Sequence, residues 1–174
     1  ISFLDDGPSI HVVVQGEEQH LPFLVVDESF LTAATNGVDG STPDIAQTTT
    51  TANFSAAFTS VQGADGATVA YAPVIAGNGT LTNLIDSGTG LGVVLDQTGN
   101  VVQGYVTGHE GEAAFLVFTL SVDAATGDVT LTQTRAVHEG VGETPDVSEG
   151  ITLGSNLVTL AAKITDKAAL DAYR

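Results

Sequence analysis

The residues of this chain with the clearest chemical potential are carboxylates at the ends of apolar segments. Asp5 and Asp6 stand near the start of the chain, Asp27 and Glu28 follow a Leu-Val-Val segment, and Asp166 ends the last apolar segment. Calcium is bound by about six to eight oxygen atoms from carboxylates, carbonyls and water. Strand ends cluster at the two poles of a β-sandwich, so these acids can meet there. The sequence therefore predicts calcium as a cofactor and all five acids as its ligands.

A second pair of acids flanks one turn. Asp123 and Asp128 enclose the residues Ala-Ala-Thr-Gly, and the two carboxylates could share an ion. Asp in a hairpin turn is also ordinary turn chemistry, because its side chain accepts bonds from the turn backbone. The ligand spacing of an EF-hand loop is absent. This pair is therefore the weaker candidate.

The residue types speak against an enzyme. The chain has no cysteine, so a nucleophile would be Ser or Thr, and no G-x-S-x-G motif is present. His11, His20, His109 and His138 are scattered, and we interpret them as solvated loop residues. Thiolates and histidine pairs at zinc spacing are missing, and there is no phosphate-binding or dinucleotide motif. We expect a protein without catalytic residues.

The charge of the chain restricts its partners. Twenty-one acidic residues stand against four basic ones, which gives a formal net charge of −17. Such a surface repels nucleic acid and anionic lipid. Bound calcium would relieve the self-repulsion, and solubility in a salty medium is the alternative explanation. No apolar run approaches the roughly 20 residues of a membrane span, so we expect neither nucleic-acid binding nor membrane insertion.

Residues 113–134 predict the central structural element, a β-hairpin. Leu116, Phe118, Leu120 and Val122 alternate with Val117, Thr119, Ser121 and Asp123. This period of two is typical of a strand with one buried face. After the turn the alternation continues through residues 129–132. Gly127 can take the positive φ that the turn needs. The rest of the chain supplies more strands of this kind.

The wider pattern predicts an all-β protein, an antiparallel β-sandwich (immunoglobulin-like or related) with long loops. We expect residues 1–10 to be a junction from a preceding repeat, residues 11–166 to be a single sandwich domain, and residues 167–174 to be a tail. The chain starts like an excised piece of a longer protein. The expected strands are residues 2–4, 11–14, 24–29, 48–59, 67–75 and 151–165, with a second hairpin over 91–106. The expected loops are 32–43, 76–90 and 138–150.

Several phrases of the sequence are similar to one known group of repeats. They are SFLDDGPSI (2–10), VVDESFL (25–31), LDQTGNVVQGYV (95–106), FTLSVDAATGDVTLTQTRAVHE (118–139) and the ITL…LVTLAAKITDK run (151–167). Together they resemble the repeat domains of large repeats-in-toxin (RTX) adhesins, which are bacterial surface proteins exported by type I secretion. The resemblance is weakest over residues 32–90.

This resemblance implies one module of a tandem array at the bacterial cell surface, outside the cell. Its partners would be neighbouring repeats of the same chain, joined by calcium at stiffened junctions. The resemblance carries Asp5, Asp6 and Asp166 over as calcium ligands. One departure is that Lys167 and the residues after it replace the acidic segment that usually follows the last strand. We therefore expect part of a junction site to be missing or altered.

The expected function is a non-enzymatic structural or extender module that holds an adhesin tip away from the cell and supports cell adhesion or biofilm formation. The rival is a ligand-binding module of the same kind of adhesin, for carbohydrate or protein, which the irregular stretches 32–47 and 76–90 motivate. Carbohydrate sites often use exposed aromatic rings, but Trp is absent here and only Tyr71, Tyr105 and Tyr173 carry a phenol.

Overall fold

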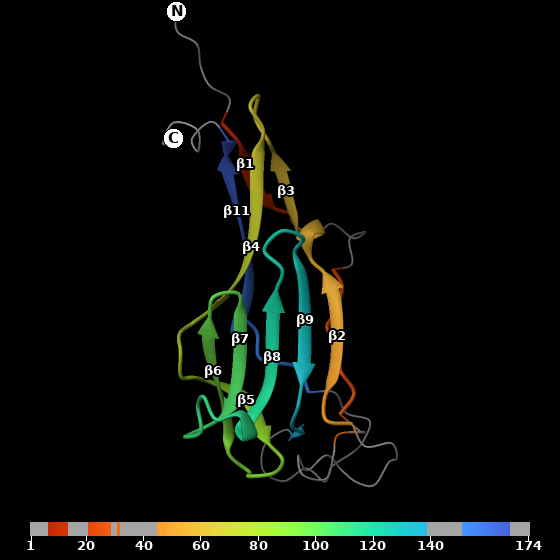
Figure 1. Cartoon of the computed structure of the whole chain (residues 1–174), viewed down its shortest axis with the longest axis vertical. Helices are drawn as coiled ribbons and strands as arrows, with labels where there is room; N and C mark the ends of the chain where they lie inside the picture. The colour runs from red at the N-terminus through yellow and green to blue at the C-terminus, as the bar shows by residue number, and fades with distance from the viewer. Residues whose placement is uncertain (1–6, 14–20, 29–30, 32–44, 139–150, 168–174) are drawn as a thin grey trace, which may run out of the picture.

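The computed structural model describes residues 7–13, 21–28, 31, 45–138 and 151–167. Within them the chain is built almost entirely of antiparallel strands (Figure 1). The predicted all-β class is therefore confirmed. The predicted junction 1–10 and tail 167–174 fall largely outside the described residues. In the described part, no helix is long and apolar enough to cross a membrane.

The described residues form strands β1 to β11 and two short 3-10 helices, η2 and η3. Their bounds are β1 Ser9–Val12, β2 Thr48–Asn53, η2 Ser55–Ala57, β3 Phe58–Val61, β4 Ala67–Ile75, β5 Thr80–Asp86, β6 Gly92–Thr98, β7 Val101–Val106, η3 Ala113–Phe115, β8 Leu116–Val122, β9 Asp128–Gln133, β10 Val137–His138 and β11 Val158–Asp166.

Seven strands form one curled sheet in the order β10-β5-β6-β7-β8-β9-β2, which we call the core sheet. The other four strands form two antiparallel pairs, β1 with β3 and β4 with β11, and we call them the four-strand region. In Figure 1 the four-strand region extends from one end of the core sheet. The molecule is therefore elongated along its strands.

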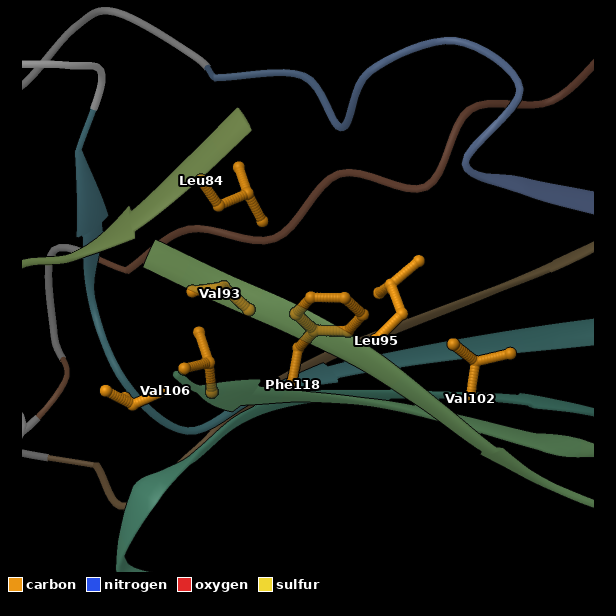
Figure 2. Close-up of a cluster of buried hydrophobic side chains, with 7 residues drawn as sticks. Leu84, Val93, Leu95, Val102, Val106 and Phe118 are labelled. Atoms are coloured by element: carbon orange, nitrogen blue, oxygen red, sulfur yellow. The ribbon is translucent and has the colours of Figure 1, made fainter. Parts of the chain in front are cut away.

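The hydrophobic core lies on the inner face of the core sheet. Val93, Leu95, Val102 and Val106 are completely buried, and Phe118 joins them (Figure 2). The second layer of the sandwich comes from the end of β4, the segment before β11 and the first residue of β11. Its packed side chains are Ile75, Ile151, Leu153, Leu157 and Val158. β-branched residues dominate this core, as expected for strands with one buried face.

A glycine makes room for Phe118, a buried phenylalanine of this core. Gly104 on β7 pairs directly with Phe118 on β8. A Cβ at Gly104 would lie 2.3 Å from the Phe118 ring, so the ring covers the glycine backbone. Any larger residue at position 104 would therefore displace the Phe118 ring.

The strongest sequence patterns predicted their elements correctly. The central hairpin is β8 and β9, and the second hairpin is β6 and β7. β4 begins and ends at the predicted residues, 67 and 75. Gly127 takes a φ of 76°, as the central turn requires.

Four weaker predictions were wrong. The expected strand 151–165 begins only at Val158, because residues 155–157 form a turn. The expected strand 48–59 is split by η2, because Asn53 Oδ1 accepts bonds from the Ser55 amide and hydroxyl. The expected loop 76–90 contains strand β5. The expected strand 24–29 has no ladder partner where it is described, although residues 21–28 alternate in burial.

Candidate functional site

The structure separates the predicted calcium ligands. Asp166 ends β11 and pairs with Ala67 at the start of β4. Asp27 and Glu28 lie on the extended segment 21–28, where Glu28 contacts the end of β9 and the start of β10. These two places are at opposite ends of the molecule (Figure 1). Asp5 and Asp6 lie outside the described residues.

Glu28 fastens segment 21–28 to the core sheet. Its Oε2 accepts bonds from Gln133 Nε2 at 2.5 Å and from the Val137 amide at 3.0 Å. Burial raises the pKa of the Glu28 carboxyl above its ordinary value, although both hydrogen bonds oppose this. One oxygen of this predicted ligand thus already serves two protein donors.

The pair Asp123 and Asp128 serves its own turn. Asp123 Oδ1 accepts the amides of Ala125 at 2.8 Å and Thr126 at 3.0 Å, and these bonds lower the Asp123 pKa. Asp128 accepts Asn53 Nδ2 at 2.7 Å and the Thr126 hydroxyl at 2.9 Å. The carboxylates thus stabilise the hairpin turn and its contact with β2.

Among the described residues, no group of three or more His, Asp or Glu side chains is arranged to hold a metal ion. Asp5 and Asp6, the ligands predicted together with Asp166, lie outside those residues. The calcium ligands therefore remain a prediction.

On the outer face of the core sheet, strands β2, β9 and β8 carry two rows of hydroxyl groups. Thr49, Thr132 and Thr119 lie in register across β2, β9 and β8, and the next row holds Thr51, Thr130 and Ser121. The Thr49 and Thr132 hydroxyls are 3.0 Å apart, and those of Thr51 and Thr130 are 2.8 Å apart. The side chains of these two rows are uncharged, although the chain has a net charge of −17.

One end of this hydroxyl surface is hollowed. A shallow, open depression of about 420 Å³ is lined by Thr51, Ser121, Val122, Asp123, Asp128 and Thr130. Its hydroxyls donate and accept hydrogen bonds, and its carboxylates accept them. This chemistry suits a ligand that carries several hydroxyl donors. The lining includes no aromatic ring on which a sugar could stack.

A buried ion pair that the sequence analysis did not foresee joins β5 to the segment before β10. Arg135 Nε bonds to Asp86 Oδ1 at 2.8 Å and its Nη2 bonds to Oδ2 at 2.9 Å. Asp86 is completely buried and Arg135 is 9 % exposed. Burial raises the Asp86 pKa, but the bonds from Arg135 and Thr89 outweigh it and hold the pKa below its ordinary value.

The surroundings of Arg135 show that the pair is structural. The guanidinium also donates to the Ala114 carbonyl at 2.9 Å and lies 5.5 Å from the centre of the Phe115 ring. A Cβ at Gly88 would be 2.7 Å from Arg135 Nη2, so the glycine leaves space for the charge. The only sequence signal was that Arg135 is the sole basic residue before residue 160.

The three described histidines lie on different elements of the structure. His11 lies on β1, in agreement with the strand expected from residue 11, and His138 lies on β10. The interpretation of these two histidines as loop residues was therefore wrong. His109 does lie in a loop, where it stacks on Phe115 at 3.8 Å and meets Glu112 at 3.2 Å. His20 lies outside the described residues.

These features define an acidic, cysteine-free, all-β module whose buried charges serve its own structure. Residues 23–171 match the family described as Domain of unknown function (DUF5801). The match spans most of the chain, so the protein belongs to this family. No curated protein and no solved structure matches it.

Proposed function

We propose that this protein is a non-enzymatic structural module of a large secreted RTX-type adhesin, stabilised by calcium at the bacterial cell surface and supporting adhesion or biofilm formation. The sequence phrases similar to such repeats lie within or beside the family match at residues 23–171. A strongly acidic chain without cysteine needs a source of rigidity other than disulfides outside the cell. Calcium bound by oxygen ligands meets that need.

The observation that carries this proposal is the position of Asp166. It ends the last strand beside the turn formed by residues 62–66, and Ser9 of β1 pairs with Val61 on the other side of that turn. Asp6 precedes Ser9 by three positions, and three residues of chain span at most about 11 Å. We therefore propose Asp5 and Asp6, which precede β1 in the sequence, as further ligands beside Asp166.

Thermal unfolding after chelation, followed by calcium titration, tests the proposal. Binding to the folded state alone raises the melting temperature, and about 100 Kd of free calcium stabilises by roughly 2.7 kcal/mol. We expect a rise with calcium and little rise with magnesium. Asp166→Asn should reduce it, whereas Asp96→Asn on β6 should leave it intact. A flat response to calcium would reject calcium stabilisation.

The hydroxyl-rich depression supports a second candidate, a ligand-binding module for carbohydrate. Its test is titration with neutral oligosaccharides, followed by the amide NMR signals of residues 121–130. Thr130→Val should weaken binding about tenfold, the effect of one hydrogen bond of about 1.5 kcal/mol. Thr119→Val, on the same face but outside the depression, is the matched control. Unchanged signals throughout the titrations would reject this candidate.

A further inference from the structure

Both described ends of the chain lie at one end of the molecule. Ser9, the first residue of β1, pairs with Val61, and Asp166, the last of β11, pairs with Ala67. Val61 and Ala67 are the two sides of the turn 62–66, and the Lys167 amide bonds to the Gly66 carbonyl at 3.2 Å. We call this place the 62–66 end. Figure 1 shows β1 and β11 side by side there.

The strands that begin and end here are directed along the long axis of the molecule (Figure 1). β1 leads away from the 62–66 end, and β11 returns to it after pairing with β4 over nine residues, from Val158 to Asp166. Nine residues of strand span roughly 30 Å. The core sheet, with the loop that holds η3, lies at the other end of these strands.

The core sheet is fixed to the four-strand region by hydrogen bonds to β4. The Tyr71 amide donates to the Ala124 carbonyl at 2.9 Å, and Asn100 Nδ2 donates to the Tyr71 carbonyl at 3.1 Å. Gln97 Nε2 donates to the Pro73 carbonyl at 2.8 Å. Residues at the turns of both core hairpins thus form hydrogen bonds with β4, and these bonds join the core sheet to the four-strand region.

We infer that this protein is a pendant module: in a longer chain it hangs from the 62–66 end instead of lengthening the chain from pole to pole. The inference takes one assumption from the proposed function, namely that the chain is part of a longer protein that continues at both ends. An extender that adds its full length must receive the chain at one pole and release it at the other. Here the connections to the preceding and the following repeat lie at the same pole. Each module therefore lengthens an array only by its width and not by its length.

The inference also assigns the contacts between modules. Neighbouring repeats meet at the 62–66 end, where Asp166 lies, and the core sheet projects outward with its hydroxyl surface and the loop around η3. This arrangement repeats the core-sheet surface along an array while adding little length. The partner at the 62–66 end is therefore another repeat of the same chain, and the far end faces the surroundings.

Distance measurement between spin labels tests the geometry on the chain itself, which has no cysteine of its own. The labels go on Gly7→Cys and Thr165→Cys. A Cβ at Gly7 meets nothing within 4 Å, and Thr165 is exposed. We expect a separation on the order of 10–20 Å from strand and sheet spacings. The control pair, Ala113→Cys with Thr165→Cys, should lie at least roughly 30 Å apart.

If the first pair is as far apart as the control pair, the inference is overturned, whatever calcium does. If the first pair is close and calcium has no effect on melting, the calcium proposal fails while the pendant geometry stands. The two failures are therefore distinguishable.

Tandem chains of two, three and four copies extend the test to an array. Their largest dimension in solution is measured by small-angle X-ray scattering. A pendant arrangement predicts that the third and fourth copies each add much less than one module length. Growth by a full module length with every added copy would overturn the inference.

Discussion

The core sheet and the four-strand region use the same kind of strand but bury very different amounts of it. In the core sheet, Val93, Leu95, Val102, Val106 and Val117 are completely buried. In β1, β3, β4 and β11 only Pro73 is buried, and it lies where β4 meets the core sheet. Val12 and Val61 of the four-strand region are 69 % and 57 % exposed.

This difference shows where the stability of the molecule resides. Burial of apolar area contributes about 25 cal/mol per Å², so the core sheet holds most of the stabilisation. The four-strand region depends on its backbone ladders and on the bonds that join β4 to the core hairpins. Regions with few buried contacts open locally at lower free energy than the whole. The end that would join neighbouring repeats is therefore the less stable one, where a bound ion or a neighbour would stabilise most.

The largest expected effect comes from breaking the buried charge pair of the core sheet. Asp86→Ala leaves the Arg135 guanidinium buried without its partner and should lower the free energy of unfolding by about 3–5 kcal/mol. Urea unfolding measures it. Asp86→Ala combined with Arg135→Met should recover part of the loss, since two apolar residues leave no unpaired charge. A loss below about 1 kcal/mol for the single variant would contradict the buried geometry.

Matched leucine truncations test the comparison directly. Leu95 on β6 is completely buried, whereas Leu160 on β11 is half-buried. Leu95→Ala should cost about 2–5 kcal/mol in the free energy of unfolding. Leu160→Ala removes less buried area, so its cost should be about 1 kcal/mol. Equal costs in chemical denaturation would show that the four-strand region is as well packed as the core sheet.

Hydrogen exchange sharpens the comparison without any substitution. Amides of β4 and β11 should exchange at least about tenfold faster than amides of β6 and β7, a difference of about 1.4 kcal/mol in opening free energy. Mass spectrometry of peptic fragments measures both sets in one sample. Uniform protection across all four strands would mean that the two regions unfold as one unit.

A strand could be predicted from the sequence where one of its faces is apolar and its partner strand is close to it in the chain. The β8–β9 hairpin follows from the alternation around Phe118 and from its turn chemistry. β5 was missed because polar residues occupy two of its three buried positions, Thr82 and Asp86. Thr82 bonds to the Val93 carbonyl, and Asp86 is paired with Arg135, 49 residues away. No local pattern reveals such a distant partner.

The candidate site was predictable only in part, for a related reason. Acids at segment ends can be recognised in the sequence, but their spatial grouping depends on strand order. Glu28 and Asp166 were expected to be able to meet at a pole, yet the chain places them at opposite ends. The hydroxyl surface arises from the lateral register of β2, β9 and β8, and the pairing of β2 with β9 joins residues about 80 positions apart in the sequence.

The smallest expected effect concerns Glu28, a second carboxyl that contacts the core sheet. Its environment raises its pKa, whereas the environment of Asp86 lowers the pKa of that residue. Burial raises the pKa of Glu28 above its ordinary 4.5, so its charge opposes folding at neutral pH. Glu28→Gln keeps an oxygen that can accept from Gln133 and Val137. It should therefore stabilise the protein at pH 7, by less than about 1 kcal/mol because solvent screens a half-buried group.

The pH dependence separates the two carboxyls by sign. The favourable contribution of protonated Glu28 is complete below pH 4.5 and is lost as pH rises through the raised pKa. The gain in stability from Glu28→Gln should therefore be absent at pH 4 and grow toward pH 7.

The lowered pKa of Asp86 has the opposite consequence. The stabilisation from its charged form is complete above pH 3.8 and is lost as pH falls through the lowered pKa. The penalty of Asp86→Asn should therefore shrink in acid. Urea midpoints of both variants and the parent protein from pH 3 to pH 7 measure the two slopes, and slopes of equal sign would contradict the opposite environments of Glu28 and Asp86.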